Sequence, residues 1–300
     1  MSIQSFVVNQ VLRLTFKPKR GTPLNVTAAR KKVAQAARRN PPVPKDVRHV
    51  PVPASAASGL CAAEWLSVER PARTVLYFHG GGYFFCGLDT HRPVCGYLAR
   101  VAQAQVLSVD YRMAPEHVFP AAVDDAVAWY AALLRQGVSP ANITVAGDSA
   151  GGGLAVACLL AARERGLPMP AAALLFSPWV DLACSGETMH TLADADVMFQ
   201  PELLPQAAAL YVGDKPLTEP LASPLYADLR GLPPMLIHAS RHEILLSDST
   251  RLHERARAVG VASQLLLRDR LPHVWPTMVM LPEARRSLKE SARFMEQHTR

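Results

Sequence analysis

Residues 143–153 read ITVAGDSAGGG and contain the pentapeptide G-D-S-A-G at positions 147–151. The apolar run 143–146 predicts a buried strand, and the segment from about 151 to 166 predicts a helix. A serine flanked by glycines between a strand and a helix is typical of a nucleophile elbow. In such a turn the hydroxyl is exposed at the N-terminus of the helix, whose dipole favours developing negative charge. Ser149 is therefore our candidate nucleophile.

Short apolar runs alternate with helical segments on both sides of this motif. We expect further strands at 61–69, 74–78, 106–110, 173–176, 235–239 and 264–267. We expect further helices at 121–136, 248–259 and 282–298. This alternation predicts an α/β fold with a mostly parallel central sheet and helices on both faces.

Two segments interrupt the alternation. Ile3, Phe6, Val7, Val11 and Leu14 recur at spacings of three and four, which predicts an amphipathic helix with an apolar face that covers something. A second helix begins after about residue 27, with small residues inward and basic residues outward, and the prolines from 41 onward end it. Residues 183–230 contain helical pieces but no convincing strand. We therefore predict a catalytic domain at 46–182 and 231–300, with a helical cap built from residues 1–45 and the insertion 183–230.

The segment His79–Gly82 reads HGGG and directly follows the predicted strand 74–78. Attack on an ester carbonyl creates an oxyanion, and a glycine-rich loop can direct backbone N–H groups at it without obstruction. We assign Gly81 and Gly82, together with the amide of Ala150, to an oxyanion hole. A phosphate-binding loop is disfavoured because no lysine follows in P-loop fashion and G-x-G-x-x-G is absent.

Several of these motifs together resemble the hormone-sensitive-lipase family of α/β-hydrolases, in its bacterial carboxylesterase branch. The matching segments are His79–Gly82, Tyr111–His117, Phe119–Ala122, Gly147–Gly152 and Ser177–Trp179. The resemblance spans roughly residues 45–300 and implies the α/β-hydrolase fold. It also implies the order oxyanion motif, nucleophile, acid and histidine along the chain.

A serine nucleophile of this kind works with a histidine base and an acid that orients the histidine. His273 follows the last predicted strand, on a loop that would bring it over Ser149. The resemblance places the acid after the strand that begins near Pro233-Pro234, where similar proteins have aspartate and this chain has Glu243. Asp248 is the main rival and Asp269 a weaker one.

Other acidic residues near the motifs have structural interpretations. Asp148 flanks the nucleophile in the elbow, and Glu116 is expected to anchor the loop 111–120 by charge pairing. Neither is placed to orient His273. In the insertion, four apolar residues are candidates for lining an acyl pocket: Met189, Met198, Phe199 and Tyr211.

The resemblance implies a carboxylesterase that acts on short- to medium-chain acyl esters through an acyl-enzyme, with no metal or organic cofactor. A hydrolase-fold binding protein is the alternative from another class, but all three triad positions are filled here. Amidase or lactonase activity stays open because the acyl-transfer machinery is shared. The resemblance also suggests a homodimer paired through an edge strand.

The distribution of charge bears on whether the protein binds an anionic partner. The formal net charge is +7, and basic residues are frequent in the first forty, among them Lys17, Lys19, Arg20, Arg30, Lys31, Lys32, Arg38 and Arg39. They suit either an anionic partner or the solvated faces of surface helices, and we favour the second because no nucleic-acid motif accompanies them.

The five cysteines are odd in number and form no CxxC pair, which favours reduced thiols. No stretch reaches the length of a membrane span, so we expect a cytoplasmic protein with no stable membrane insertion.

Overall fold

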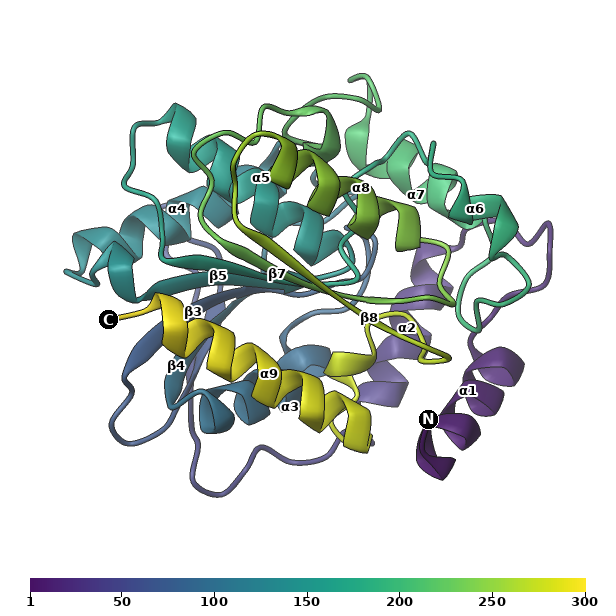
Figure 1. Cartoon of the computed structure of the whole chain (residues 1–300), viewed down its shortest axis with the longest axis horizontal. Helices are drawn as coiled ribbons and strands as arrows, with labels where there is room; N and C mark the ends of the chain where they lie inside the picture. The colour runs from purple at the N-terminus through teal and green to yellow at the C-terminus, as the bar shows by residue number, and fades with distance from the viewer.

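A single eight-stranded sheet forms the centre of the molecule in the computed structural model, which describes all residues 1–300 (Figure 1). The strands are β1 Arg48–Val52, β2 Ala63–Ser67, β3 Arg73–Phe78, β4 Ala104–Val109, β5 Ile143–Asp148, β6 Ala172–Phe176, β7 Met235–Ser240 and β8 Ser263–Arg268. Their order is β1-β2-β4-β3-β5-β6-β7-β8, and all pairs are parallel except β1–β2 and β2–β4. The predicted α/β class with a mostly parallel sheet is confirmed.

Helices cover both faces of this sheet (Figure 1). The helices are α1 Ile3–Thr15, α2 Val26–Ala37, α3 Leu88–Val101, α4 Ala121–Arg135, α5 Ala150–Glu164, α6 Thr188–Thr191, α7 Leu203–Val212, α8 Leu246–Ala258 and α9 Pro282–His298. In Figure 1, α4, α5 and α8 lie on one face of the sheet, and α3 and α9 lie on the other. Every residue of β5, β6 and β7 is buried, as strands covered on both faces require.

Parallel strands bring their carboxyl ends to one edge of the sheet, where α/β proteins form their binding sites. The loops after β3, β5, β7 and β8 carry the predicted oxyanion residues, nucleophile, acid and histidine. The insertion 183–230 follows β6 and contains α6, α7 and a short 3₁₀ turn, with no strand, as predicted. Topology therefore gathers residues that are far apart in sequence.

Two elements were not predicted from the sequence. Strand β1 is mostly exposed and includes Pro51, so it lacks the apolar alternation that identifies a strand; its pairing with β2 orders it. Helix α3 contains Pro93, a residue that normally ends a helix. Burial of one face of α3, including Val94, Cys95 and Leu98, stabilises it despite the proline.

Helix α1 forms as predicted, but the expectation that its apolar face covers the protein was wrong. Ile3 and Leu14 are each 82% exposed, and Ser5 is the only buried residue of the helix. The opposite side of α1 is held by polar contacts: the hydroxyls of Ser2 and Ser5 donate to the carboxylate of Glu283 at 2.9 and 2.8 Å. These tethers orient the apolar stripe toward solvent.

Candidate active site

Ser149 occupies a strained turn between β5 and α5. Its φ of 52° and ψ of −122° lie in a region that non-glycine residues rarely adopt. A Cβ atom on Gly147 would approach the carbonyl oxygen of Gly151 to 2.2 Å, and a Cβ on Gly151 would approach that of Phe78 to 2.1 Å. Both glycines are therefore required for the close packing that holds the serine in this conformation.

His273 and Glu243 form a buried pair at the ends of β8 and β7. The Nδ1 atom of His273 lies 2.7 Å from Oε2 of Glu243, and both side chains are almost completely buried. The other carboxylate oxygen of Glu243 accepts the backbone N–H of Ser240 at 3.0 Å. Nε2 of His273 is buried without a hydrogen-bond partner, and it lies in the same cavity as Ser149. The imidazole is thus fixed on one side and free on the other.

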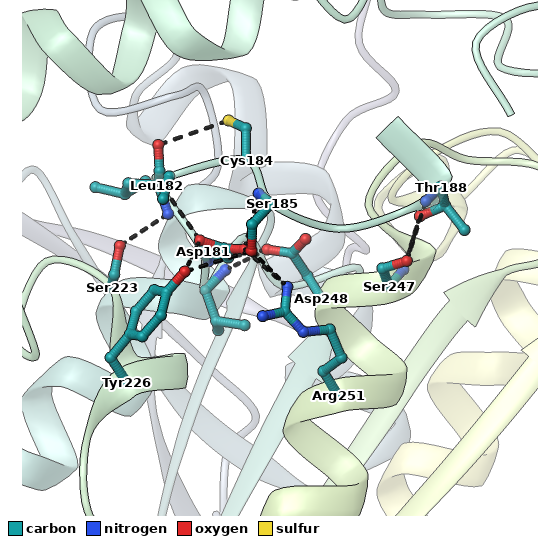
Figure 2. Close-up of polar contacts among 12 residues, drawn as sticks. Asp181, Leu182, Cys184, Ser185, Thr188, Ser223, Tyr226, Ser247, Asp248 and Arg251 are labelled. Carbon is teal, nitrogen blue, oxygen red and sulfur yellow. Dashed lines mark hydrogen bonds and ion pairs between the residues drawn. The ribbon is translucent and has the colours of Figure 1, made fainter. Parts of the chain in front are cut away.

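The rival acids have other partners. Oδ1 of Asp248 accepts the backbone N–H groups of Val180 and Asp181, each at 2.9 Å (Figure 2). Asp269 is exposed beside Arg241, 3.4 Å away. The structure therefore brings Glu243, and neither rival, to His273.

The glycine loop after β3 presents two free backbone donors. Gly81 and Gly82 adopt positive φ values of 114° and 58°, and their N–H groups donate no hydrogen bond within the protein. A Cβ atom on Gly81 would lie 2.0 Å from the carbonyl oxygen of Phe85, so no other residue fits there without moving the loop. Ala150 is the first residue of α5, a position whose N–H has no intrahelical partner.

Asp148 anchors this glycine loop. One of its carboxylate oxygens accepts from the Tyr77 hydroxyl at 2.8 Å and from the Gly80 N–H at 3.1 Å. His91 of α3 lies 3.1 Å from the same carboxylate. Burial alone would raise the pKa of Asp148, but His91 and the Tyr77 hydroxyl hold that pKa below its usual value. Asp148 is thus a structural carboxylate, as predicted, whereas the contribution of His91 was missed because the helix carrying it was not predicted.

His79 shapes the start of the same loop. Its ring stacks on Tyr111 with centroids 4.3 Å apart, and the Tyr111 hydroxyl donates to the His79 carbonyl at 2.7 Å. Burial, with His91 nearby, lowers the pKa of His79 to about 4. An imidazole that stays neutral at physiological pH adds no charge beside the glycine loop.

Glu116 pairs with the second helix of the chain. Arg30 of α2 donates to both carboxylate oxygens of Glu116, at 2.6 and 2.7 Å. Arg30 also donates to the carbonyl oxygens of Phe84 and Ala114 at 2.7 and 2.9 Å. This charge-paired anchor, expected for the loop 111–120, therefore also fastens α2 beside the glycine loop.

A cavity of about 500 Å³ lies over Ser149 and His273. Residues of α1, α2 and their linker line it, as do residues of the insertion 183–230. Lining residues from these segments include Leu12, Phe16, Leu24, Val33, Met198 and Leu203. The Phe199 ring stands edge-on to His273 with centroids 5.0 Å apart.

Two of the four predicted pocket residues lie elsewhere. Met198 and Phe199 line the cavity, whereas Met189 and Tyr211 do not. Tyr211 is fully buried and stacks on Tyr83 at 3.7 Å. Apolar character alone did not distinguish lining from packing. Met198 and Phe199 lie in the irregular segment between α6 and α7, whereas Met189 and Tyr211 lie on those helices.

Other sequence expectations concern metals, thiols and membranes. No group of three or more His, Cys, Asp or Glu side chains is placed to hold a metal ion. All five cysteines are unpaired. None of the helices combines the length and apolar character that a bilayer crossing requires.

We expect Asp248→Asn to stabilise the protein at alkaline pH. Burial, together with the Asp181 carboxylate, raises the pKa of Asp248 to about 8. The unfolded chain releases this proton near pH 4, so the free energy of unfolding falls as pH rises from about 4 to about 8. Asparagine keeps the Oδ1 acceptor and carries no charge, so the variant should gain on the order of 2 kcal/mol over wild type at pH 8.

Urea unfolding at pH 5 and pH 8 measures this gain. Asp269→Asn removes an exposed carboxylate (71% side-chain exposure) and is the matched control, with no such gain expected. An Asp248→Asn protein that loses stability with pH as steeply as wild type would contradict the assignment of the buried proton.

Comparisons with known proteins agree with this architecture. Residues 75–277 match a family model described as the α/β-hydrolase fold. An acetyl-hydrolase of Streptomyces hygroscopicus is 42% identical over 80% of this chain and 81% of its own length. An esterase of Acinetobacter venetianus is 35% identical over 79% of each chain.

Solved structures extend the similarity over almost the whole chain. The esterase EstE5, in a crystal soaked with p-nitrophenyl butyrate, has a TM-score of 0.92 at 39% identity and covers 99% of both chains. An esterase described as belonging to the bacterial hormone-sensitive lipase family has a TM-score of 0.91 at 38% identity, again over 99% of both chains. With its strand–serine–helix elbow and glycine loop, this chain belongs to the α/β-hydrolases and, among them, to the hormone-sensitive-lipase family of esterases.

Proposed function

We propose that this protein is a serine carboxylesterase that hydrolyses short- to medium-chain acyl esters. The observation that carries the proposal is the orientation of His273: Nδ1 is held by Glu243 at 2.7 Å, while Nε2 is unpartnered in the cavity that contains Ser149. An imidazole fixed in this way can accept a proton from the serine and return it to the leaving group.

Acylation is the first half of the proposed reaction. The Ser149 oxygen attacks the ester carbonyl carbon while Nε2 of His273 takes the hydroxyl proton. The carbonyl oxygen becomes an oxyanion and accepts hydrogen bonds from the N–H groups of Gly81, Gly82 and Ala150. The ester C–O bond then breaks, and the alcohol leaves with the proton from His273.

Deacylation repeats these steps with water. His273 takes a proton from the water, whose oxygen attacks the acyl carbon on Ser149. The same N–H groups stabilise the second tetrahedral intermediate. Breakdown returns the proton to Ser149 and releases the carboxylic acid. Glu243 keeps the imidazole in the productive tautomer and stabilises its protonated form in both halves.

The cavity and the relatives support a short or medium acyl group. About 500 Å³ is within the usual range for a small-molecule site. One relative is named an acetyl-hydrolase, and EstE5 was soaked with a butyrate ester. We propose that residues 1–45 and 183–230 act together as the cap that limits acyl length. The homodimer implied by the family resemblance stays a prediction.

Hydrolysis of p-nitrophenyl esters with acyl chains from two to sixteen carbons tests the substrate class. We expect kcat/KM to be highest for the shorter esters and to fall for the longest. Val33→Trp, which adds bulk to the cavity wall on α2, should lower kcat/KM for medium chains by about tenfold and much less for acetate.

Ala34→Trp adds the same bulk on an exposed part of the same helix and is the matched control. If the two substitutions changed the dependence of kcat/KM on acyl length equally, the cap would not be what limits acyl length. Absence of ester cleavage by wild type would overturn the proposed function.

A further inference from the structure

The outer face of α1 is an unpartnered apolar stripe. We use the name "outer face" for Ile3, Val7, Val11 and Leu14, which are 51–82% exposed. These positions lie on one side of the helix, since they are spaced by three and four residues. Clustered large apolar residues at a surface usually mark an interaction site. Figure 1 shows α1 at the periphery of the molecule, away from the sheet.

All charged residues of the segment that carries this face are basic. Residues 1–45 contain no aspartate or glutamate and ten lysines or arginines. Of these, Lys19 and Lys31 are exposed and form no ion pair, and Arg13 lies on α1 itself. An apolar helix face in a segment of one charge sign is the composition of amphipathic helices that lie on anionic lipid.

The inner side of the same segment borders the active-site cavity. Leu12 and Phe16 line that cavity, opposite the exposed stripe. Contacts near the start and end of α1 hold it in place: Ser2 and Ser5 bond to Glu283, and Lys17 donates to the carbonyl oxygens of Ala193 and Asp196 at 2.7 and 2.6 Å. One surface of the cap thus faces solvent while the other faces the catalytic residues.

We propose that the outer face of α1 docks the enzyme on an anionic phospholipid surface. The apolar side chains enter the boundary between headgroups and acyl chains, and exposed lysines and arginines of residues 1–45, such as Arg13 on the same helix, contact the lipid phosphates. The helix lies on the surface and does not cross it, because its 13 residues span about 20 Å. A second copy of the chain is disfavoured as the occupant, since two segments with ten positive charges each would repel.

Flotation of the full-length protein with vesicles tests this docking. We expect binding to vesicles of phosphatidylglycerol and phosphatidylcholine, weakening as salt rises, and little binding to phosphatidylcholine alone. Ile3→Ser combined with Leu14→Ser should reduce partitioning by about tenfold or more. Arg13→Gln, Lys19→Gln and Lys31→Gln together should reduce it by about a hundredfold at low salt, at roughly fivefold per charge.

Matched controls lie on other surfaces of the protein. Leu217→Ser with Val259→Ser removes two other exposed apolar side chains, and Arg135→Gln with Arg257→Gln and Arg293→Gln removes three other exposed charges. These controls should bind vesicles as wild type does, and every variant should hydrolyse soluble p-nitrophenyl acetate at the wild-type rate.

Ser149→Ala should also bind vesicles as wild type does, which separates docking from catalysis. Equal binding to neutral and anionic vesicles, or equal losses in the control variants, would overturn the proposal. A different result would also overturn it. If the wild type were a dimer, and Ile3→Ser with Leu14→Ser made it a monomer without changing vesicle binding, the outer face would be a contact between two copies of the chain.

Discussion

Replacing Ser149 with alanine should lower kcat for p-nitrophenyl butyrate by about 10⁵–10⁶-fold, because no other group can carry the acyl intermediate. The fold should be retained, since the alanine side chain needs no more room than the serine it replaces. A fluorophosphonate probe should add its mass to the wild-type chain and not to the variant, which would locate the nucleophile independently of turnover.

Ser139→Ala is the control for this experiment. Ser139 is exposed and its side chain caps no N–H group, so this variant should keep wild-type activity and probe labelling. If Ser149→Ala still hydrolysed the ester substantially after repeated purification, Ser149 would not be the nucleophile.

Replacing Glu243 with glutamine should lower kcat by about 10³–10⁴-fold with little change in KM, because the amide neither fixes the productive tautomer of His273 nor stabilises its positive charge. Glutamine has the same shape and can still accept the Ser240 N–H with its oxygen. The loss should therefore be chemical and not a consequence of unfolding, which circular dichroism and thermal unfolding would check.

Asp248→Asn is the decisive comparison for the acid. Its carboxylate bonds to the backbone of Val180 and Asp181, whereas His273 bonds to Glu243. Activity should stay within about threefold of wild type, as for a substitution outside the reacting groups. If Asp248→Asn were inactive and Glu243→Gln active, the assignment of the acid would be reversed.

Local sequence patterns predicted the strands and helices whose own side chains are mostly buried. The apolar runs at β3, β5, β6 and β7 identified central strands because a strand buried on both faces needs apolar side chains throughout. The exposed strand β1 and the proline-containing α3 were missed, because pairing and packing with distant segments stabilise them. Local propensity carries no signal of such contacts.

The candidate nucleophile followed from sequence alone because a nucleophile elbow is a local structure. Gly147 is required by the Gly151 carbonyl within the pentapeptide, and Gly151 by the Phe78 and His79 carbonyls at the end of the neighbouring strand. The pentapeptide between an apolar run and a helix was nevertheless sufficient to recognise the elbow. The glycine loop at residues 80–82 was recognisable for the same reason, since its positive φ values at Gly81 and Gly82 favour glycine.

Tertiary structure showed that Glu243, which the sequence favoured over Asp248, contacts His273. It alone decided between pocket and packing residues of the insertion and which face of α1 points outward. Each of these depends on distances between segments far apart in the chain, such as the 2.7 Å contact of Glu243 with His273. The sequence by itself determined the fold class, the strand–serine–helix elbow and the glycine loop after β3, because glycines at fixed positions and alternating apolar runs mark these structures. Side-chain partnership and exposure arise only when the whole chain packs.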